Sequence, residues 1–332
     1  MTGAMLLAAA GLTIPAQAGP LLFVGDSGGG NGSLKTFDAT TGALLNQDSI
    51  SGSLGYPTGI AVGPDGNVYL GDNVNGTVDL FSGTTGSYIG QFVAPGSGGM
   101  ISPSGLTFGP DGNLYEADDG SGGFGFVNVY SGMGAFVTQF VPPNTGPPNG
   151  GLYGPNGLAF GPNGDLYVTD QTNGIDLFGP TGTFLSVLIP VGSGPGLAGL
   201  GTPSGLAFGP NGDLYVTDET NNVVDVFDPT TGDFLGVFGA TASLAQPIDL
   251  AFGPNGNLYV TDAGGVEEFN GTTGASMGTF ISTQSGNLID GQYLAFSSTA
   301  PEPSTLALAA LAGIFGWRWR RRIVRRSQGP AL

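Results

Sequence analysis

The sequence has no cysteine and no histidine, and it has few basic residues. Without cysteine, the chain can form no disulfide and offers no thiolate ligand to a metal. Without histidine, it cannot use a Ser-His-Asp triad, a histidine general base or an imidazole metal ligand. All but one of the seven basic residues are arginines beyond residue 317, so residues 19–300 contain a single cation, Lys35.

The acidic residues are distributed in the opposite way. Of the 25 carboxylates, only Glu302 lies outside residues 19–300. A region of this charge cannot neutralise phosphates, which excludes nucleic acid as a partner. The same charge favours solubility and the attraction of cations.

The most prominent pattern in the sequence is an internal repeat. The segment GLAFGPNGDLYVTD occupies residues 157–170 and recurs unchanged at 205–218. Less perfect copies of the same segment begin at Gly59, Gly105, Asp249 and Tyr293. Successive copies begin 44 to 52 residues apart. Periods of this length indicate a repeat architecture.

Residues 205–238 show what one repeat unit builds. Pro210-Asn211-Gly212 predicts a tight turn, because proline fixes φ and Asn-Gly accepts positive φ. The following DLYVTD alternates in the way a strand does, and further turns at ETNN and PTTG separate two more strands. The unit therefore predicts four short antiparallel strands. Their apolar faces need neighbours on both sides, and a ring of such sheets supplies them.

We predict an all-β fold, a six-bladed β-propeller that occupies residues 19–300. Five blades are continuous in sequence and lie near residues 59–92, 105–140, 157–189, 205–238 and 249–280. The sixth blade is split, because residues 21–50 supply three strands and residues 293–296 supply the missing first strand. This pairing of the C-terminal strand with the N-terminal blade closes the ring.

Within residues 203–227, the order of residues is P-S-G-L-A, P-N-G, L-Y-V-T-D, an asparagine at 221 and V-F. This pattern resembles the NHL repeat, and the resemblance extends over about residues 21–298. It implies a six-bladed propeller that serves as a binding platform. The chain departs from the family at an arginine that commonly precedes the third-strand valine, where it has Thr77, Gly174 and Val223. That departure removes the cationic surface that other NHL propellers use to bind RNA.

Residues 1–18 predict export. Apolar residues from Ala4 to Ile14 precede Ala16-Gln17-Ala18, which has the small-x-small pattern of a signal-peptidase site. A basic segment before the apolar stretch is missing, and a buried N-terminal strand or helix is the alternative interpretation. We expect residues 1–18 to be a signal peptide.

The C-terminal residues 301–326 combine Pro301-Glu302-Pro303, an apolar helix over 305–319 and a cluster of arginines. Residues 306–319 would span about 21 Å at ~1.5 Å per residue, less than a ~30 Å hydrocarbon core, which suits transient anchoring. Arginines beside such a helix mark its cytoplasmic side. Residues 327–332 are predicted to be disordered.

The order of these three parts resembles the PEP-CTERM sorting tail. The resemblance implies a Gram-negative bacterium and an exosortase-like sorting protease that cleaves near Pro-Glu-Pro. It also implies transient anchoring by the C-terminal helix in the inner membrane, followed by delivery to the cell surface or the exopolysaccharide matrix.

Every predicted second strand ends in aspartate, and the propeller places these carboxylates on one face: Asp26, Asp72, Asp118, Asp170, Asp218 and Asp262. They are either a cation-binding ring or acceptors for backbone N–H groups of the turns that follow. A structural role is favoured because all six repeats share the residue.

Glu116 breaks the apolar pattern of the second strands, where the other blades have valine or leucine, and Glu268 does the same in a third strand. A buried carboxylate costs stability unless it is paired or bound to a metal, and Ca²⁺ prefers such oxygen ligands. We therefore predict a calcium site at Glu116, Asp118 and Asp119. The alternative is an irregular blade in which Glu116 reaches solvent.

Loops rich in glycine and proline lie on the same face as the aspartates, at residues 93–104, 141–156, 189–204, 239–248 and 281–292. They either carry binding specificity or are tolerated insertions. We predict a monomeric, non-enzymatic surface or matrix propeller that binds a polysaccharide or a surface protein through this face, with no catalytic residues and no required cofactor. The alternative is a calcium-dependent hydrolase of the gluconolactonase type, with Glu116, Asp118 and Asp170 supplying metal ligands.

Overall fold

The computed structural model describes residues 19–28, 31–48, 54–121, 123–143, 151–193, 199–239, 244–283 and 288–297. The chain divides into two units, Met1–Ser297 and Ser298–Leu332, and the described residues all belong to the first. The predicted signal peptide, the sorting tail with its apolar helix and the C-terminal residues 327–332 lie outside the described residues.

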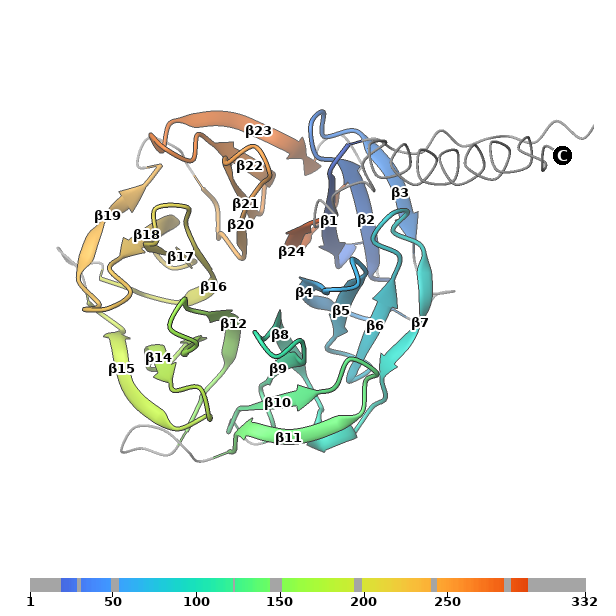
Figure 1. Cartoon of the computed structure of the whole chain (residues 1–332). Coiled ribbons are helices and arrows are strands. Elements are labelled where there is room, and N and C mark those ends of the chain that lie inside the picture. Colours follow the sequence, from blue (N-terminus) through green and yellow to red (C-terminus); the bar gives the residue numbers. More distant parts are fainter. Residues whose placement is uncertain are drawn as a thin grey trace, which may run out of the picture. The chain divides into compact units, whose positions relative to one another are not determined.

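Six four-stranded antiparallel sheets stand around a central axis, which confirms the predicted six-bladed β-propeller (Figure 1). Blade 1 consists of β24 (Gly291–Phe296), β1 (Leu21–Asp26), β2 (Ser33–Asp38) and β3 (Leu44–Asp48). Blade 2 consists of β4 (Pro57–Val62), β5 (Val68–Asp72), β6 (Thr77–Phe81) and β7 (Tyr88–Val93). Blade 3 follows the short 3₁₀ segment η2 (Ser97–Gly99) and consists of β8 (Pro103–Phe108), β9 (Leu114–Asp118), β10 (Phe126–Tyr130) and β11 (Phe136–Val141).

The remaining three blades repeat this order along the chain. Blade 4 consists of β12 (Pro155–Phe160), β13 (Leu166–Asp170), β14 (Gly174–Phe178) and β15 (Phe184–Pro190). Blade 5 consists of β16 (Pro203–Phe208), β17 (Leu214–Asp218), β18 (Val223–Phe227) and β19 (Phe234–Phe238). Blade 6 consists of β20 (Leu250–Phe252), β21 (Leu258–Asp262), β22 (Gly265–Phe269) and β23 (Ser276–Ser282). The first strand of each blade lies nearest the axis (Figure 1).

The tyrosine repeated in blades 2 to 6 joins each of these blades to the next. In blade 5, Tyr215 packs edge-to-face against Phe238 of its own outer strand and Phe252 of blade 6, with ring centroids 5.2 and 5.0 Å apart. In blade 6, Tyr259 makes the same contacts with Phe280 and with Phe296 of blade 1. Such pairs stabilise beyond the area that they bury. The aromatic residues of the GLAF and LYVTD segments are therefore contacts between blades.

A hydroxyl beside the axis ties neighbouring blades in the same way. Thr217 Oγ1 donates to the carbonyl oxygen of Ile248 at 2.9 Å, and Thr169 Oγ1 donates to that of Ser204 at 2.6 Å. Each acceptor belongs to the first-strand segment of the next blade. The threonine of LYVTD thus donates a hydrogen bond to a carbonyl of the next blade.

The first strands approach one another so closely that most have glycine at the third position. A Cβ atom on Gly105 would lie 1.7 Å from the carbonyl oxygen of Asn156, so no other residue fits there. Gly59, Gly157 and Gly205 occupy the equivalent positions in their blades, whereas blades 6 and 1 have Asp249 and Tyr293. Among these six equivalent positions, only the last two carry a side chain.

The split blade closes as predicted. Strand β24 pairs antiparallel with β1, with Val24 opposite Leu294, and Ser297 N–H donates to the Leu21 carbonyl at 2.8 Å. Asp26 accepts the Asp290 N–H at 2.8 Å and forms an ion pair with Lys35 at 2.5 Å. Burial alone would raise the pKa of Asp26, but Lys35 and the amides of Asp290 and Gly28 lower it below its usual value. The one cation of residues 19–300 therefore lies at the ring closure.

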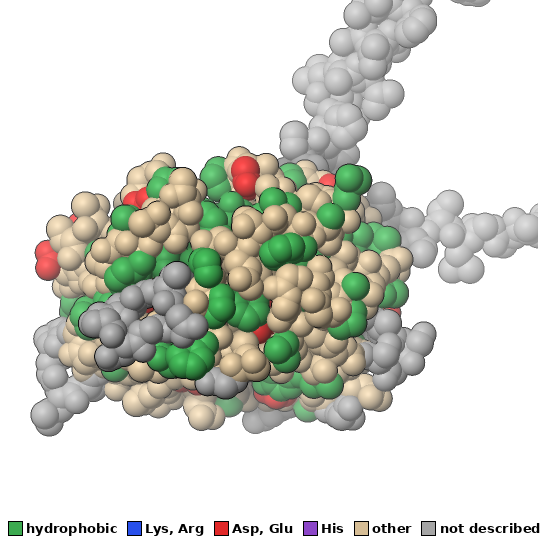
Figure 2. All heavy atoms as spheres, turned by 90° about the horizontal axis from the view of Figure 1, so that it is seen from below, with side chains coloured by type: hydrophobic (Ala, Val, Ile, Leu, Met, Phe, Trp, Pro, Cys, Tyr) green, Lys and Arg blue, Asp and Glu red, His purple; other side chains and the backbone are tan. Residues whose placement is uncertain are grey.

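The second position of every outer strand is an exposed apolar residue. The exposed fractions of these side chains lie between 44% and 56%: Leu45, Ile89, Val137, Leu185, Leu235 and Met277. Figure 2, which views the ring from its edge, shows apolar side chains scattered among polar ones and no Lys or Arg on this face. Because every blade repeats this position, it does not distinguish one blade from another.

We predict that Lys35→Met destabilises the protein by about 3 to 5 kcal/mol, the usual cost of leaving one member of a buried ion pair without its partner. Both side chains are at most 3% exposed, so water cannot replace the ammonium. Chemical denaturation of the full chain measures the effect. The double variant Lys35→Met, Asp26→Asn should lose less than the sum of the two single variants. A loss of under about 1 kcal/mol for Lys35→Met, as for an exposed pair, would contradict a buried ion pair between Lys35 and Asp26.

Candidate functional site

The six aspartates that end the second strands all lie at the ring face where those strands stop. In blade 2, Asp72 accepts the N–H of Gly55 at 2.8 Å and the N–H of Val74 at 3.1 Å. In blade 5, Asp218 accepts the N–H of Gly201 at 2.6 Å and the N–H of Asn221 at 3.0 Å. Asp26, Asp118, Asp170 and Asp262 each accept the same two kinds of amide. Each carboxylate thus holds the loop entering its blade against the turn that follows it.

Of the three residues of the predicted calcium site, the structure brings Glu116 and Asp118 together and places Asp119 apart from them. Glu116 is fully buried inside blade 3, where its Oε2 accepts a hydrogen bond from Asn128 Nδ2 at 3.1 Å. Burial, and then the neighbouring Asp118 carboxylate, raise the pKa of Glu116 well above its usual value. Glu116 therefore does not reach solvent. Asp119 lies on the other side of the strand and lines the centre of the ring.

Glu268 lies near the opposite face, where its Oε1 accepts hydrogen bonds from Tyr259 at 2.8 Å and from Asn257 at 2.7 Å. Within the described ranges, no three carboxylate, histidine or cysteine side chains are grouped as a metal site. The calcium site stays a prediction.

Further carboxyl groups are buried in the third strands. Asp79, Asp176 and Asp225 occupy the position that Lys35 occupies in blade 1. Burial is the main reason that the pKa of Asp79 rises to about 6 and that those of Asp176 and Asp225 rise to about 7. The neighbouring second-strand aspartates add to these shifts.

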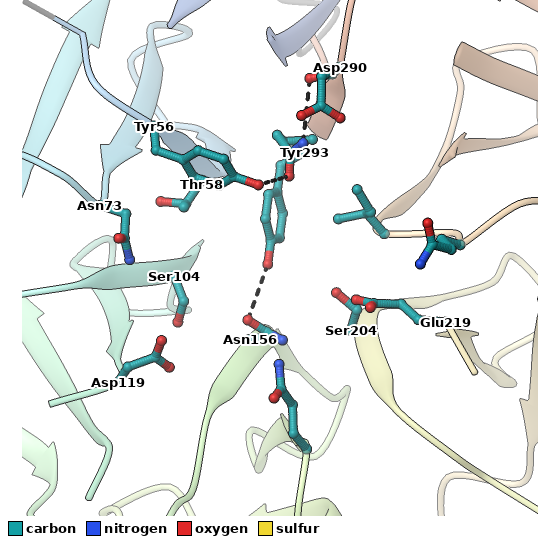
Figure 3. A pocket seen from close by; sticks show the side chains of 14 residues that line it. Tyr56, Thr58, Asn73, Ser104, Asp119, Asn156, Ser204, Glu219, Asp290 and Tyr293 are labelled. Atoms are coloured by element: carbon teal, nitrogen blue, oxygen red, sulfur yellow. Dashed lines mark hydrogen bonds between the residues drawn. The ribbon is translucent and has the colours of Figure 1, made fainter. Parts of the chain in front are cut away.

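A cavity of about 400 Å³ opens at the centre of the face where the second strands end (Figure 3). The second position of each first-strand segment contributes one lining residue: Thr58, Ser104, Asn156, Ser204, Ile248 and Gln292. The position after the second-strand aspartate contributes Asn73, Asp119, Gln171 and Glu219, and the position before the first strand contributes Tyr56, Gln246 and Asp290. We call this cavity the channel mouth.

Tyr293 stands in the middle of the channel mouth (Figure 3). Its hydroxyl lies 3.5 Å from Asn156 Oδ1, on the opposite side of the ring. Burial, and then the charges of Asp249, Glu219 and Asp119, raise its pKa, so the hydroxyl remains a hydrogen-bond donor. Gln292, the preceding residue of β24, accepts a hydrogen bond from the Tyr56 hydroxyl at 2.8 Å.

A smaller cavity of about 110 Å³ also borders Tyr293, and the first-strand glycines and Asp249 line it. Asp249 Oδ2 accepts the N–H of Leu294 at 3.0 Å, and burial raises the pKa of the carboxyl to about 7. Asp249 and Tyr293 thus fill, with polar side chains, the space that glycine leaves open in the other four blades.

Sequence reasoning missed the channel mouth, although the repeat contains a signal for it. The second-strand aspartate is the same in every copy, and the first strand of four copies reads Pro-x-Gly. The residue after the aspartate differs in every copy, the middle residue of Pro-x-Gly is threonine, serine or asparagine, and both positions contribute to the lining of the cavity. Variable positions inside an otherwise constant motif therefore mark the place where the blades cease to be equivalent.

The chain carries an NHL repeat. A family model of this description matches residues 200–227, which form most of the first three strands of blade 5. A second model, the PEP-CTERM protein-sorting motif, matches residues 299–322. The NHL resemblance and the sorting tail seen in the sequence are both confirmed. Among curated proteins, none matches the sequence.

Solved structures similar to this propeller share its fold at low sequence identity. A chain of a nidogen/laminin complex is 19% identical with a TM-score of 0.64, over 84% of this chain and 98% of that one. A gluconolactonase from Xanthomonas campestris is 16% identical with a TM-score of 0.56, over 71% and 78%. An inactive variant of the virginiamycin B lyase from Staphylococcus aureus is 17% identical with a TM-score of 0.54, over 78% and 84%.

The sorting motif indicates an exported protein with a membrane-anchored sorting step in a Gram-negative bacterium. In the part of the chain that the structure describes, no helix is long and apolar enough to cross a membrane. The predicted apolar helix at 305–319 lies outside that part and stays a prediction.

We predict that the protein is less stable at pH 8 than at pH 5. A carboxyl whose pKa is raised by folding keeps a proton that the unfolded chain releases, so its contribution is present in acid and is lost as pH rises toward the folded value. For Asp79, Asp176, Asp225 and Asp249 this window runs from the usual value of 3.8 to about 6 or 7. Thermal unfolding at the two pH values measures it.

Glu116→Val tests at one residue whether a buried carboxyl with a raised pKa causes this pH dependence. Valine is chosen because it occupies the equivalent position in other blades. The free energy of unfolding of the variant, relative to the wild type, should be higher at pH 8 than at pH 5 by at least about 1 kcal/mol. One pH unit of proton linkage is worth about 1.4 kcal/mol. Glu116→Gln, which keeps the shape, is the control. If added Ca²⁺ stabilises the wild type but not Glu116→Val, Glu116 is a calcium ligand rather than a protonated carboxyl.

Proposed function

We propose that this exported propeller acts at the cell surface or in the surrounding matrix, where it binds a polysaccharide through the channel mouth without catalysing a reaction. The observation that carries the proposal is the break in the repeat. The scaffold residues are the same in most blades, whereas the residue after the second-strand aspartate, which lines the cavity in four blades, differs in every blade. A binding site on a repeated scaffold is expected where the repeats differ.

The chemistry of the channel mouth supports a ligand rich in hydroxyl groups. Its lining contains amides, carboxylates, hydroxyls and Tyr56, and contains no basic residue. Amides both donate and accept hydrogen bonds, while carboxylates accept them from hydroxyls. The volume of about 400 Å³ is in the usual range of small-molecule sites, which suits one or two sugar units of a longer chain.

The sequence itself favours binding over catalysis. The chain has no histidine to serve as a general base and no cysteine nucleophile, and its single cation outside the tail is the buried Lys35. Carboxylates without histidine or cysteine can still hold the metal ion of a calcium-dependent hydrolase. Calcium-dependent turnover of a lactone is therefore the outcome that would favour the alternative function.

We predict that Gln171→Ala weakens binding of the full chain to extracellular polysaccharide about 2- to 10-fold, because one hydrogen bond contributes about 0.5 to 1.5 kcal/mol. Gln171 lines the channel mouth. Asn163→Ala is the matched control, because it removes an amide from the same blade at the opposite face, in the turn between β12 and β13. Glycan-array binding followed by calorimetry measures both. Equal affinity of the two variants would contradict a site at the channel mouth.

A further inference from the structure

The carboxylates that line the channel mouth come from every second blade of the ring. First strands of consecutive blades are neighbours, and β24 of blade 1 lies between those of blades 6 and 2. In blade order from 1 to 6, the lining residues that precede the first strand or follow the second include Asp290, Asn73, Asp119, Gln171, Glu219 and Gln246, and the second position of the first strand adds the amides Gln292 in blade 1 and Asn156 in blade 4. Carboxylates therefore belong to blades 1, 3 and 5 alone, and amides belong to blades 1, 2, 4 and 6.

Figure 3 shows the three carboxylates approaching the cavity from three sides, around the side chain of Tyr293. Asp119 Oδ1 is inaccessible to solvent and has no hydrogen-bond partner among the described residues. Burial, followed by the charge of Asp118, raises the pKa of Asp119 to about 6. A buried oxygen of this kind has given up its hydrogen bonds to water, and no donor of the described residues replaces them.

No cation of the propeller can supply that donor. Residues 19–300 contain only Lys35, which is 3% exposed and is paired with Asp26 at the ring closure. A recess lined by charges of one sign concentrates the field within it and attracts ligands of the other sign. A ligand that carries a cationic donor would supply the hydrogen bond and the opposite charge that the described residues of the channel mouth do not provide.

We propose that the ligand of the channel mouth is a polysaccharide that carries free amino groups, a polymer of non-acetylated amino sugar. Its ammonium groups would pair with the carboxylates of Asp119, Glu219 and Asp290. Its hydroxyl groups would bond to the amides between them. This inference rests on the proposed function, since it names the class of sugar that the same site takes.

The placement of carboxylates in every second blade explains why an amino sugar fits better than a metal ion or a neutral sugar. A metal ion gathers its ligands around one point, and the described residues hold no such group of three. A neutral sugar would leave three carboxylates in a partly enclosed cavity without an opposite charge. A polymer with one amine on each sugar offers separated charges among hydroxyl groups, which matches carboxylates separated by amides.

Calorimetry of the full chain with two oligosaccharides tests the proposal directly. The probes are a glucosamine tetramer and the N-acetylglucosamine tetramer, which have the same backbone and differ in charge. At pH 7 and low salt, the amine tetramer should bind at least 10-fold more tightly. Raising the salt concentration to 0.5 M should remove most of that difference, because the added contribution is electrostatic.

Charge-removing variants locate the effect. Asp119→Asn and Glu219→Gln should each weaken binding of the amine tetramer about 5-fold or more, and should change binding of the acetylated tetramer less than 2-fold. The matched control is Asp233→Asn, which removes an exposed carboxylate just before β19, at the opposite face. This control should leave both affinities unchanged.

Each other outcome has one meaning. If both tetramers bind equally, the inference is wrong and the proposed glycan-binding function stands. If Asp233→Asn weakens the amine tetramer as much as Asp119→Asn does, the attraction is that of the whole acidic surface and the inference is wrong. If neither tetramer nor any other glycan binds, the proposed function fails as well.

Discussion

The close contact of the six first strands around the axis is the constraint on which the rest of the structure depends. At Gly105 the neighbouring carbonyl of Asn156 leaves no room even for a Cβ atom, so the ring is as tight as backbone atoms allow. A ring of this tightness forms only when every blade supplies its inner strand. The split blade therefore cannot remain open, and β24 must return to β1 from the other end of the propeller.

The same closure assembles the channel mouth. Asp290, Gln292 and Tyr293 come from the C-terminal strand or the residue before it, whereas Asn73 and Asp119 come from blades 2 and 3. Tyr293 reaches the middle of the cavity because it stands where four other blades have glycine. The ion pair of Lys35 and Asp26, and the amide of Asp290 bound to Asp26, hold this segment in place. Closure of the fold and construction of the site are thus one event.

The fold could be predicted from the sequence because the strand pattern, the turns and the blade unit all repeat along the chain. Alternation in LYVTD, the turn at Pro210-Asn211-Gly212 and the split blade all indicate the same architecture, and the structure agrees with them. The site could not be predicted in this way. Glu116 and Asp119 stand three residues apart, yet successive strand residues point to opposite sides, so one enters the blade and the other faces the axis. The lining residues are ordinary amides and hydroxyls, and only the closed ring brings them together.

A disulfide across the ring closure tests the account most directly, because the chain has no cysteine of its own. Val24 and Leu294 are paired in register, and paired residues of antiparallel strands are about 4.5 to 5.5 Å apart, within the reach of a disulfide. Val24→Cys with Leu294→Cys should oxidise completely within one chain, whereas Val24→Cys with Leu158→Cys in blade 4 should not. Free thiols or bonds between chains in the first variant would contradict a ring closed by its C-terminal strand.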